Sequence, residues 1–341
     1  ANVRRAAARV RSIMAHPSGR TVWTGLFFGL AIAVLGAYQQ LKLPPVLPEM
    51  LGAYGYPTML AGGFMSVFAV AGLTLSFGLG RMMQRHGTAT FLFGAAGLAI
   101  AGSLLILAVP ENGWVVLAGR ALEGVAMAIL AVAGPTLMTR NAGPDHLPVA
   151  AALAATWIPL GGLLASGVVN LSDLLKPGEA AWPAVFWVGI AFCLAVILAI
   201  RRVGRPGSAV DLKMPVPQAG RVAADPAART SLVLAGACFF LWSTQNMALL
   251  SWLPTYLREV NGLDGAAAAR VYALPVGLIA LFNLVAIPIL RRGVPIAVLL
   301  ATVLVAQAAL FAATAFTDLA AGLWGGLLVL TRYGALAGLT R

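Results

Sequence analysis

Long apolar runs alternate with short polar or Gly- and Pro-containing breaks over nearly all of the 341 residues. Most runs reach about 20 residues, the length that an α-helix needs to cross the hydrocarbon core of a bilayer. A transmembrane β-barrel would show short segments of alternating polarity instead. The pattern therefore predicts an all-α polytopic membrane protein. We expect ten spans, at about 21–43, 57–79, 90–109, 114–138, 148–170, 182–201, 231–257, 266–290, 294–316 and 319–338.

One long polar stretch separates the first six spans from the last four. Residues 203–230 are rich in Pro, Gly, Ala and Arg, which is typical of a flexible linker. We therefore predict a basic N-terminal segment at 1–20, a six-helix bundle at 21–202 and an incomplete, four-helix bundle at 231–341.

Composition and charge agree with a membrane location. Charged residues make up 10% of the chain, whereas soluble domains hold about 25%. The net charge of +12 does not indicate a nucleic-acid partner, because the basic residues gather at alternate loops without interleaved aromatic residues. This bias predicts that both termini are cytoplasmic, with the lipid bilayer as the surrounding partner, and we expect a bacterial plasma membrane. Four basic residues are assigned to the outer side: Lys42, Lys176, Arg258 and Arg270.

The two halves resemble each other at a single offset of 206 residues. Pairs aligned by this offset include Gln39 with Gln245, Arg85 with Arg291, and Gly87 with Gly293. Duplicated bundles are common in transporters. If the second half copies the first, it would continue for about 65 to 70 residues beyond Arg341 and hold two further spans. We expect either a truncated chain or an unusual protein of its type.

An arginine and a glutamate interrupt the apolar run at 114–138. A charge at the centre of a membrane helix costs about 2.5 to 3.5 kcal/mol, so such residues face the protein interior or a wet cavity. Arg120 and Glu123 are three residues apart, which places them on one helix face where they can form an ion pair. They could form a purely structural ion pair that stabilises the helix bundle. Alternatively, Arg120 could bind an anionic substrate through its fork of donors, and a desolvated Glu123 could carry a proton.

Residues 80–87, GRMMQRHG, resemble the Gly-x-x-x-Asp-Arg-x-Gly signature of the major facilitator superfamily. Gly80, Arg85 and Gly87 match, whereas Gln84 stands at the acid position. The resemblance implies a gating loop between spans 2 and 3, with Arg291 and Gly293 at the repeat position. From the residues alone, the segment predicts a short loop in which glycine allows a sharp turn.

Two further elements carry the same resemblance. Arg120 and Gly124 resemble the family's Arg-x-x-x-Gly element of span 4, which implies a role for Arg120 in substrate binding or proton coupling. Residues 157–162, WIPLGG, resemble the span 5 element of antiporters. From the residues alone, this element predicts a helix kink at Pro159 and close helix contact at Gly161 and Gly162.

The resemblance implies two pseudo-symmetric bundles, of which six and four helices are present, around a cavity lined by spans 1, 4, 7 and 10. Polar and aromatic side chains in the spans are candidates for this lining, although hydrogen bonds between helices would also explain them. They are Tyr38, Gln39, Gln40, Trp157, Trp242, Gln245 and Asn246.

The function that we expect is secondary active transport of a small solute by alternating access. Spans 1 and 7 most resemble carriers of cyanate and other small organic anions, so the solute could be an organic anion. The alternatives are a proton-coupled drug or metabolite antiporter, and a scaffold, receptor or inactive truncated transporter. The sequence shows no arrangement of residues typical of a catalytic nucleophile, a metal site or a Walker loop. We therefore expect no enzyme, no cofactor and no metal site. We expect a small-molecule substrate, protons if transport is coupled, and a monomer.

Overall fold

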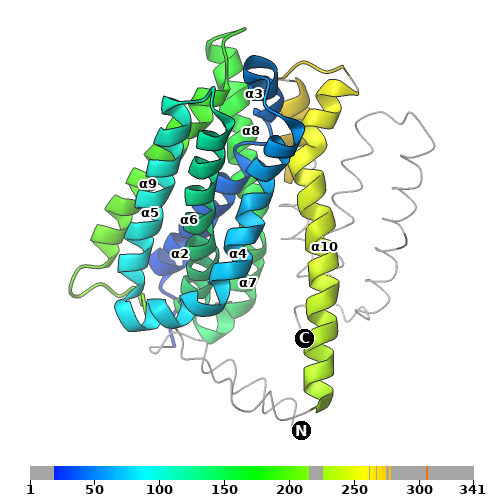
Figure 1. Cartoon of the computed structure of the whole chain (residues 1–341). Coiled ribbons are helices and arrows are strands. Elements are labelled where there is room, and N and C mark those ends of the chain that lie inside the picture. Colours follow the sequence, from blue (N-terminus) through cyan, green and yellow to red (C-terminus); the bar gives the residue numbers. More distant parts are fainter. Residues whose placement is uncertain are drawn as a thin grey trace. The chain divides into compact units, whose positions relative to one another are not determined.

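A computed structural model describes residues 19–214, 226–260, 262–265, 267–273, 276–277 and 305 (Figure 1). This part of the chain is built from helices and contains no strand, so the all-α class is confirmed. The elements are α2 (Trp23–Leu41), α3 (Leu47–Tyr54), α4 (Thr58–His86), α5 (Thr88–Ala108), α6 (Gly113–Arg140), η1 (Pro144–His146), α7 (Leu147–Ala155), α8 (Trp157–Leu175), α9 (Trp182–Val203) and α10 (Pro226–Glu259).

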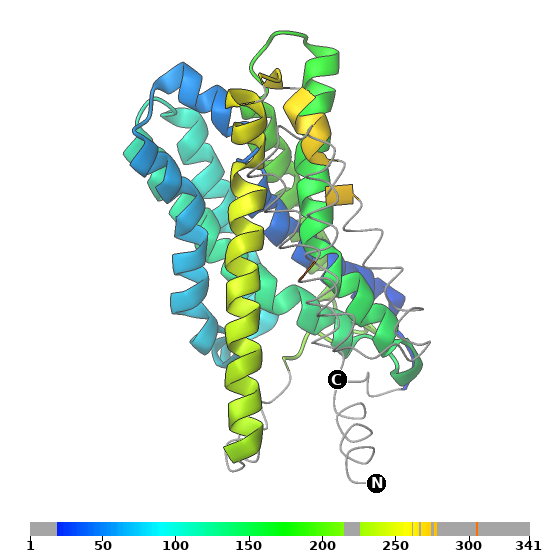
Figure 2. The same ribbon diagram turned by 90° about the vertical axis from the view of Figure 1, so that its right-hand side faces the viewer.

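The chain forms two compact units, Ala1–Pro215 and Val216–Arg341. In the described residues, six helices are long and apolar enough to cross a membrane: α2, α4, α5, α6, α8 and α9. All six lie in the first unit. In the second unit, α10 contains the predicted span 231–257 and continues through Pro254 as one helix (Figure 2). The predicted spans at 294–316 and 319–338, and most of 266–290, lie outside the described residues.

Local sequence explains where the first helices begin and end. Helix α2 ends at Leu41, because Pro44 and Pro45 have no N–H groups to bond the carbonyls of Gln40 and Leu41. The following helix, α3, was not expected from the apolar pattern, and it ends at Gly55 in a left-handed conformation with φ of 63°. Asn112 caps α6 by accepting hydrogen bonds from the first backbone N–H groups of that helix.

Small residues let α2 pack closely inside the first unit, where it contacts α6, α8 and α9. A Cβ atom added at Gly134 of α6 would lie 2.6 Å from the Cβ of Ala33, and one at Gly161 of α8 would lie 2.5 Å from the Cβ of Ala37. Association of helices in lipid depends on such close approach, because lipid tails are as apolar as the side chains. Helix α6 in turn lies between α4 and α5 (Figure 1).

The predicted fifth span is two helices rather than one kinked helix. Helix α7 ends at Ala155, Thr156 is a turn residue with φ of −88° and ψ of −7°, and α8 begins at Trp157. The break lies one turn before Pro159, because a proline lacks the N–H that would bond the carbonyl of residue 155 and its ring clashes with that carbonyl. The kink that the sequence predicts at Pro159 is therefore replaced by a break between two helices at Thr156.

The predicted gating loop at 80–87 is mostly helical. Helix α4 continues through Gly80 and Arg85 to His86, and α5 begins at Thr88. Only Gly87 turns the chain, with φ of 88° and ψ of 133°. A Cβ atom added at Gly80 would meet nothing within 4 Å, so neither a turn nor close packing requires glycine there. The expected loop is thus reduced to a single residue.

The predicted linker is attached to the first unit over part of its length. After α9 ends at Val203, the chain leads to Asp211, which pairs with Arg140 and Asn141 at the end of α6. Met214 is also buried in the apolar core of the first unit. The segment is therefore not a free linker up to Met214.

Candidate functional site

The two charged residues of α6 form an ion pair in the interior of the first unit. Nη1 of Arg120 lies 2.7 Å from Oε2 of Glu123, and both side chains are fully buried. One helical turn separates them, as their spacing requires. The other oxygen of the carboxylate faces a different cation.

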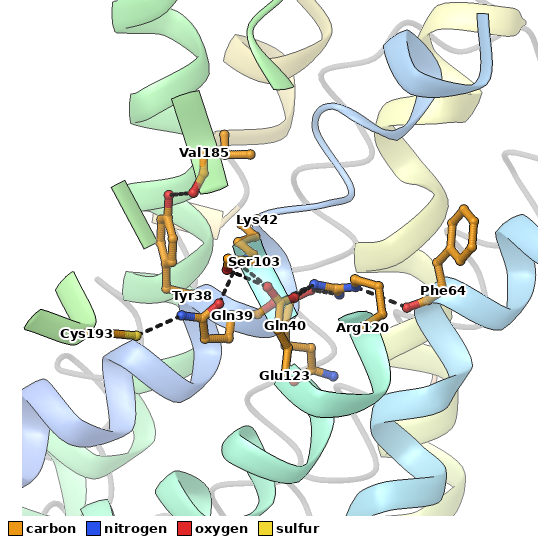
Figure 3. A network of polar contacts seen from close by, with 10 residues as sticks. All are labelled: Tyr38, Gln39, Gln40, Lys42, Phe64, Ser103, Arg120, Glu123, Val185 and Cys193. Atoms are coloured by element: carbon orange, nitrogen blue, oxygen red, sulfur yellow. Dashed lines mark hydrogen bonds and ion pairs between the residues drawn. The ribbon is translucent and has the colours of Figure 1, made fainter. Parts of the chain in front are cut away.

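That cation is Lys42, which follows directly after α2. Its Nζ lies 2.7 Å from Oε1 of Glu123 and also donates to Oε1 of Gln39 at 2.6 Å and to Oγ of Ser103 at 2.8 Å (Figure 3). The sequence counts Lys42 among the basic residues of the outer side, and it does not predict that this side chain is fully buried. The sequence offers one signal for this burial. Lys42 lies three residues after Gln39, so the two side chains lie on the same side of the helix end.

Arg120 also caps the end of α2. Its Nη1 donates to the carbonyl of Gln39 at 2.9 Å, and its Nη2 donates to the carbonyl of Gln40 at 3.2 Å. These carbonyls belong to the last helical turn, which has no intrahelical partners for its C=O groups and carries the negative end of the helix dipole. A third bond runs from Nε to the carbonyl of Phe64 in α4, at 3.4 Å. Arg120 thus ties α2, α4 and α6 together.

Two neighbouring side chains fix α2 against α9. The hydroxyl of Tyr38 donates to the carbonyl of Val185 at 2.7 Å, and Nε2 of Gln39 donates to Sγ of Cys193 at 3.3 Å (Figure 3). Both Tyr38 and Gln39 are fully buried. They orient the helix end from which Lys42 reaches Glu123.

We call the connected side chains the polar cluster; its members are Gln39, Lys42, Ser103, Arg120 and Glu123. It contains two cations and one carboxylate, so one positive charge remains without a counter-charge in the cluster. All three N–H groups of Lys42 have acceptors, and Oε1 of Glu123 also accepts from the hydroxyl of Ser103 at 2.7 Å. The cluster is therefore well satisfied in hydrogen bonds and unbalanced in charge.

Aromatic rings cover the cluster on the side of α3. Five of them contact one another in series: Phe64, Tyr56, Tyr54, Trp182 and Phe186. At one end of the series, Nζ of Lys42 lies 4.5 Å from the ring centroid of Phe186. Outside the spans, burial raises the pKa of Tyr56, whose hydroxyl donates to the carbonyl of Pro110. This hydroxyl therefore keeps its proton at neutral pH.

The remaining candidates do not contribute side chains to the polar cluster. Trp157 packs beside Gly36 of α2, where an added Cβ atom would lie 3.7 Å from the indole ring. Gln40 contributes its backbone carbonyl to Arg120. Gly124 contacts α4, with an added Cβ atom 3.3 Å from the Cβ of Ala71.

Other candidates have helical or packing positions, or fall outside what is described. Arg85 is exposed near the end of α4, and Pro159, Gly161 and Gly162 are buried in α8. The side chains of Trp242, Gln245 and Asn246 on α10 are not described, and Arg291 and Gly293 lie outside the described residues. Within the described residues, no group of three or more His, Cys, Asp or Glu side chains could hold a metal ion.

Comparison with solved structures shows transporters of similar fold. A D-xylose-proton symporter superposes with a TM-score of 0.65 at 14% identity, over 93% of this chain and 80% of that chain. The nucleoside transporter NupG gives 0.66 at 13% identity, over 91% and 81%. A bacterial homologue of the human lysosomal transporter Spinster, in an inward-facing and occupied conformation, gives 0.63 at 15% identity, over 92% and 72%.

Sequence comparison identifies the family. The glucose transporter HT1 of Trypanosoma vivax is 24% identical over 141 residues, which are 41% of this chain. This chain spans only 26% of the length of that relative. The family model of the Major Facilitator Superfamily matches residues 21–341. The chain therefore belongs to the Major Facilitator Superfamily.

Proposed function

We propose that this transporter moves a small organic anion across the membrane by alternating access. The observation that carries the proposal is the excess positive charge of the buried polar cluster, in which Lys42 and Arg120 share the single carboxylate of Glu123. A charge in a low-dielectric interior is costly unless it is paired. A monoanion that reached the cluster would supply the missing counter-charge.

The same charge argues against a neutral solute as the main substrate. The relatives of similar fold include carriers of D-xylose and nucleosides, which are uncharged molecules. A neutral solute would leave the extra cation uncompensated, whereas an anion would neutralise it. These relatives are only 13–14% identical and show the fold alone, so the charge of the cluster is the feature that favours an anion here.

Proton-coupled antiport is the second candidate. Protonation of Glu123 would remove its negative charge and leave the two buried cations without a carboxylate in the polar cluster. A proton carrier at this position would need a second change, such as loss of a proton from Lys42. We therefore favour a structural role for Glu123, as the carboxylate that holds the cluster together.

The surroundings and assembly that we propose follow from the sequence. The protein would lie in a bacterial plasma membrane with both termini cytoplasmic, in accordance with the distribution of Lys and Arg. Its two units would form the moving halves, and it would act as a monomer. No cofactor or metal is needed for transport of this kind.

Uptake into proteoliposomes tests the proposal. The purified protein is reconstituted and supplied with labelled cyanate, lactate or benzoate, which are monoanions of increasing size, and with D-xylose or uridine as neutral probes. We expect saturable uptake of at least one monoanion and none of the neutral probes. Lys42→Met should abolish this uptake, and Lys176→Met should not, because Lys176 is an exposed lysine paired with Glu179. Uptake of D-xylose or uridine without any monoanion would overturn the assignment.

A further inference from the structure

The two cations of the polar cluster are held by different kinds of acceptor. Among the described residues, Arg120 donates, besides Glu123, only to backbone carbonyls, at Gln39, Gln40 and Phe64. Within the same described part of the chain, Lys42 donates, besides Glu123, only to side chains, at Gln39 and Ser103. This difference decides which cation can leave the carboxylate.

Arg120 is fixed in its place. Its three carbonyl acceptors belong to the last turn of α2 and to α4, so they can follow a moving guanidinium only if these helices shift or unwind. The guanidinium also lies 4.2 Å above the ring of Phe68. Departure of Arg120 would leave buried C=O groups of the last turn of α2 without donors, each at a substantial cost.

Lys42 can be released at a smaller cost. Its ammonium group sits on a flexible four-carbon stem, and its acceptors are side chains that can rotate. If it leaves, Oε1 of Glu123 still accepts a hydrogen bond from the hydroxyl of Ser103, and Oε2 still pairs with Arg120. The pair that remains, Arg120 with Glu123, is neutral.

We propose that Lys42 releases Glu123 and binds the anionic group of the substrate instead. Arg120 stays paired with Glu123 and acts as a positioning residue. The proposal rests on the anion transport inferred above and assigns its specificity to one residue. After the exchange the charges balance, with one neutral pair between Arg120 and Glu123 and one between Lys42 and the substrate. This differs from the sequence-based alternative in which Arg120 binds the substrate.

The test measures melting temperatures in detergent, with and without benzoate, lactate or cyanate as the probe. The variants are Lys42→Met, Arg120→Met and Arg120→Lys, with Lys176→Met as the matched control. Lys42→Met removes the excess charge and should melt within about 2 °C of the wild type, whereas both Arg120 variants should lose about 5 °C or more, because backbone carbonyls lose their donors. Arg120→Lys keeps the charge, so it provides a second reading if Arg120→Met does not fold.

Probe binding separates the roles further. The affinity of the wild type for the most effective probe should fall by about tenfold or more in Lys42→Met, because a charge-assisted hydrogen bond is lost. It should change much less in Arg120→Lys. Wild-type affinity in Lys42→Met, or equal loss of melting temperature in Lys42→Met and Arg120→Lys, would overturn the division of roles. If no monoanion binds the wild type while the melting temperatures differ as expected, the anion function fails and the fixed position of Arg120 stands.

Discussion

Asn141 and Asp211 pair in both directions across 70 positions of sequence. The backbone N–H of Asp211 donates to Oδ1 of Asn141 at 2.8 Å, and Nδ2 of Asn141 donates to the carbonyl of Asp211 at 3.0 Å. Nη2 of Arg140 adds an ion pair with Oδ2 of Asp211 at 2.6 Å. The segment that follows α9 is therefore attached to the end of α6.

Replacement of Asn141 should detach this segment. In Asn141→Ala, the N–H and C=O groups of Asp211 both lose their partners, and we expect a loss of about 2 to 4 kcal/mol in stability. Asp211→Asn keeps both backbone bonds to Asn141 and weakens the largely buried ion pair with Arg140, which should cost less, about 1 to 2 kcal/mol. Melting of the purified variants in detergent compares the two. Equal losses would show that the ion pair, and not the amide pairing, holds the segment.

Close contact between α8 and α2 depends on a glycine. In Gly161→Ala the new methyl group would lie 2.5 Å from the Cβ of Ala37 and 2.6 Å from the backbone nitrogen of Tyr38, so the helices must separate. We expect a loss of about 1 to 3 kcal/mol. The control Gly167→Ala, on the same helix, places its methyl group in open space and should be neutral or stabilising by up to about 1 kcal/mol. Thermal melting that ranks the two variants in the opposite order would refute the packing argument.

Gly87 and Gly80 should respond differently to the same substitution. Gly87→Ala forces a side chain into a backbone conformation with φ of 88°, at a cost of about 1 to 3 kcal/mol. Gly80→Ala adds a methyl group inside α4 where nothing lies within 4 Å, so helix stability should stay equal or rise. The comparison uses melting temperatures of both variants. A loss confined to Gly80→Ala would mean that the turn lies earlier than the helix boundary indicates.

Glu123 should be the most sensitive member of the polar cluster. Glu123→Gln leaves two buried cations without a counter-charge, and we expect a loss of about 3 to 5 kcal/mol. The double variant Glu123→Gln with Lys42→Met removes one of those cations and should recover part of the stability. Glu179→Gln, at an exposed pair with Lys176, serves as the control and should cost about 1 kcal/mol or less. A stable Glu123→Gln protein that had lost only proton coupling would favour the antiporter instead.

The sequence predicts the parts of this arrangement that are local along the chain. The six apolar runs of the first unit correspond to its six membrane-length helices, because run length sets helix length in a bilayer. Arg120 and Glu123 could be paired from their spacing, since three residues along a helix bring two side chains to one face. The boundaries of the helices are harder to predict from the sequence. The break at Thr156 required the effect of Pro159 on the preceding turn, and α3 has no periodic signal of its own.

The role of Lys42 could not be obtained from such local patterns. A count of basic residues treats every lysine near a span end alike, whereas burial of this one depends on packing by distant segments. Ser103 of α5 and Glu123 of α6 lie 61 and 81 positions away in sequence, and both bind its ammonium group. Only the tertiary structure shows that one carboxylate serves two cations.

The most direct test of this account is a structure of the protein with bound benzoate, or with whichever of lactate and cyanate is transported. We predict that the anionic group lies within hydrogen-bond distance of Nζ of Lys42, and that Glu123 remains paired with Arg120. An anion bound to Arg120, with Lys42 still on Glu123, would contradict the assignment of the substrate-binding charge.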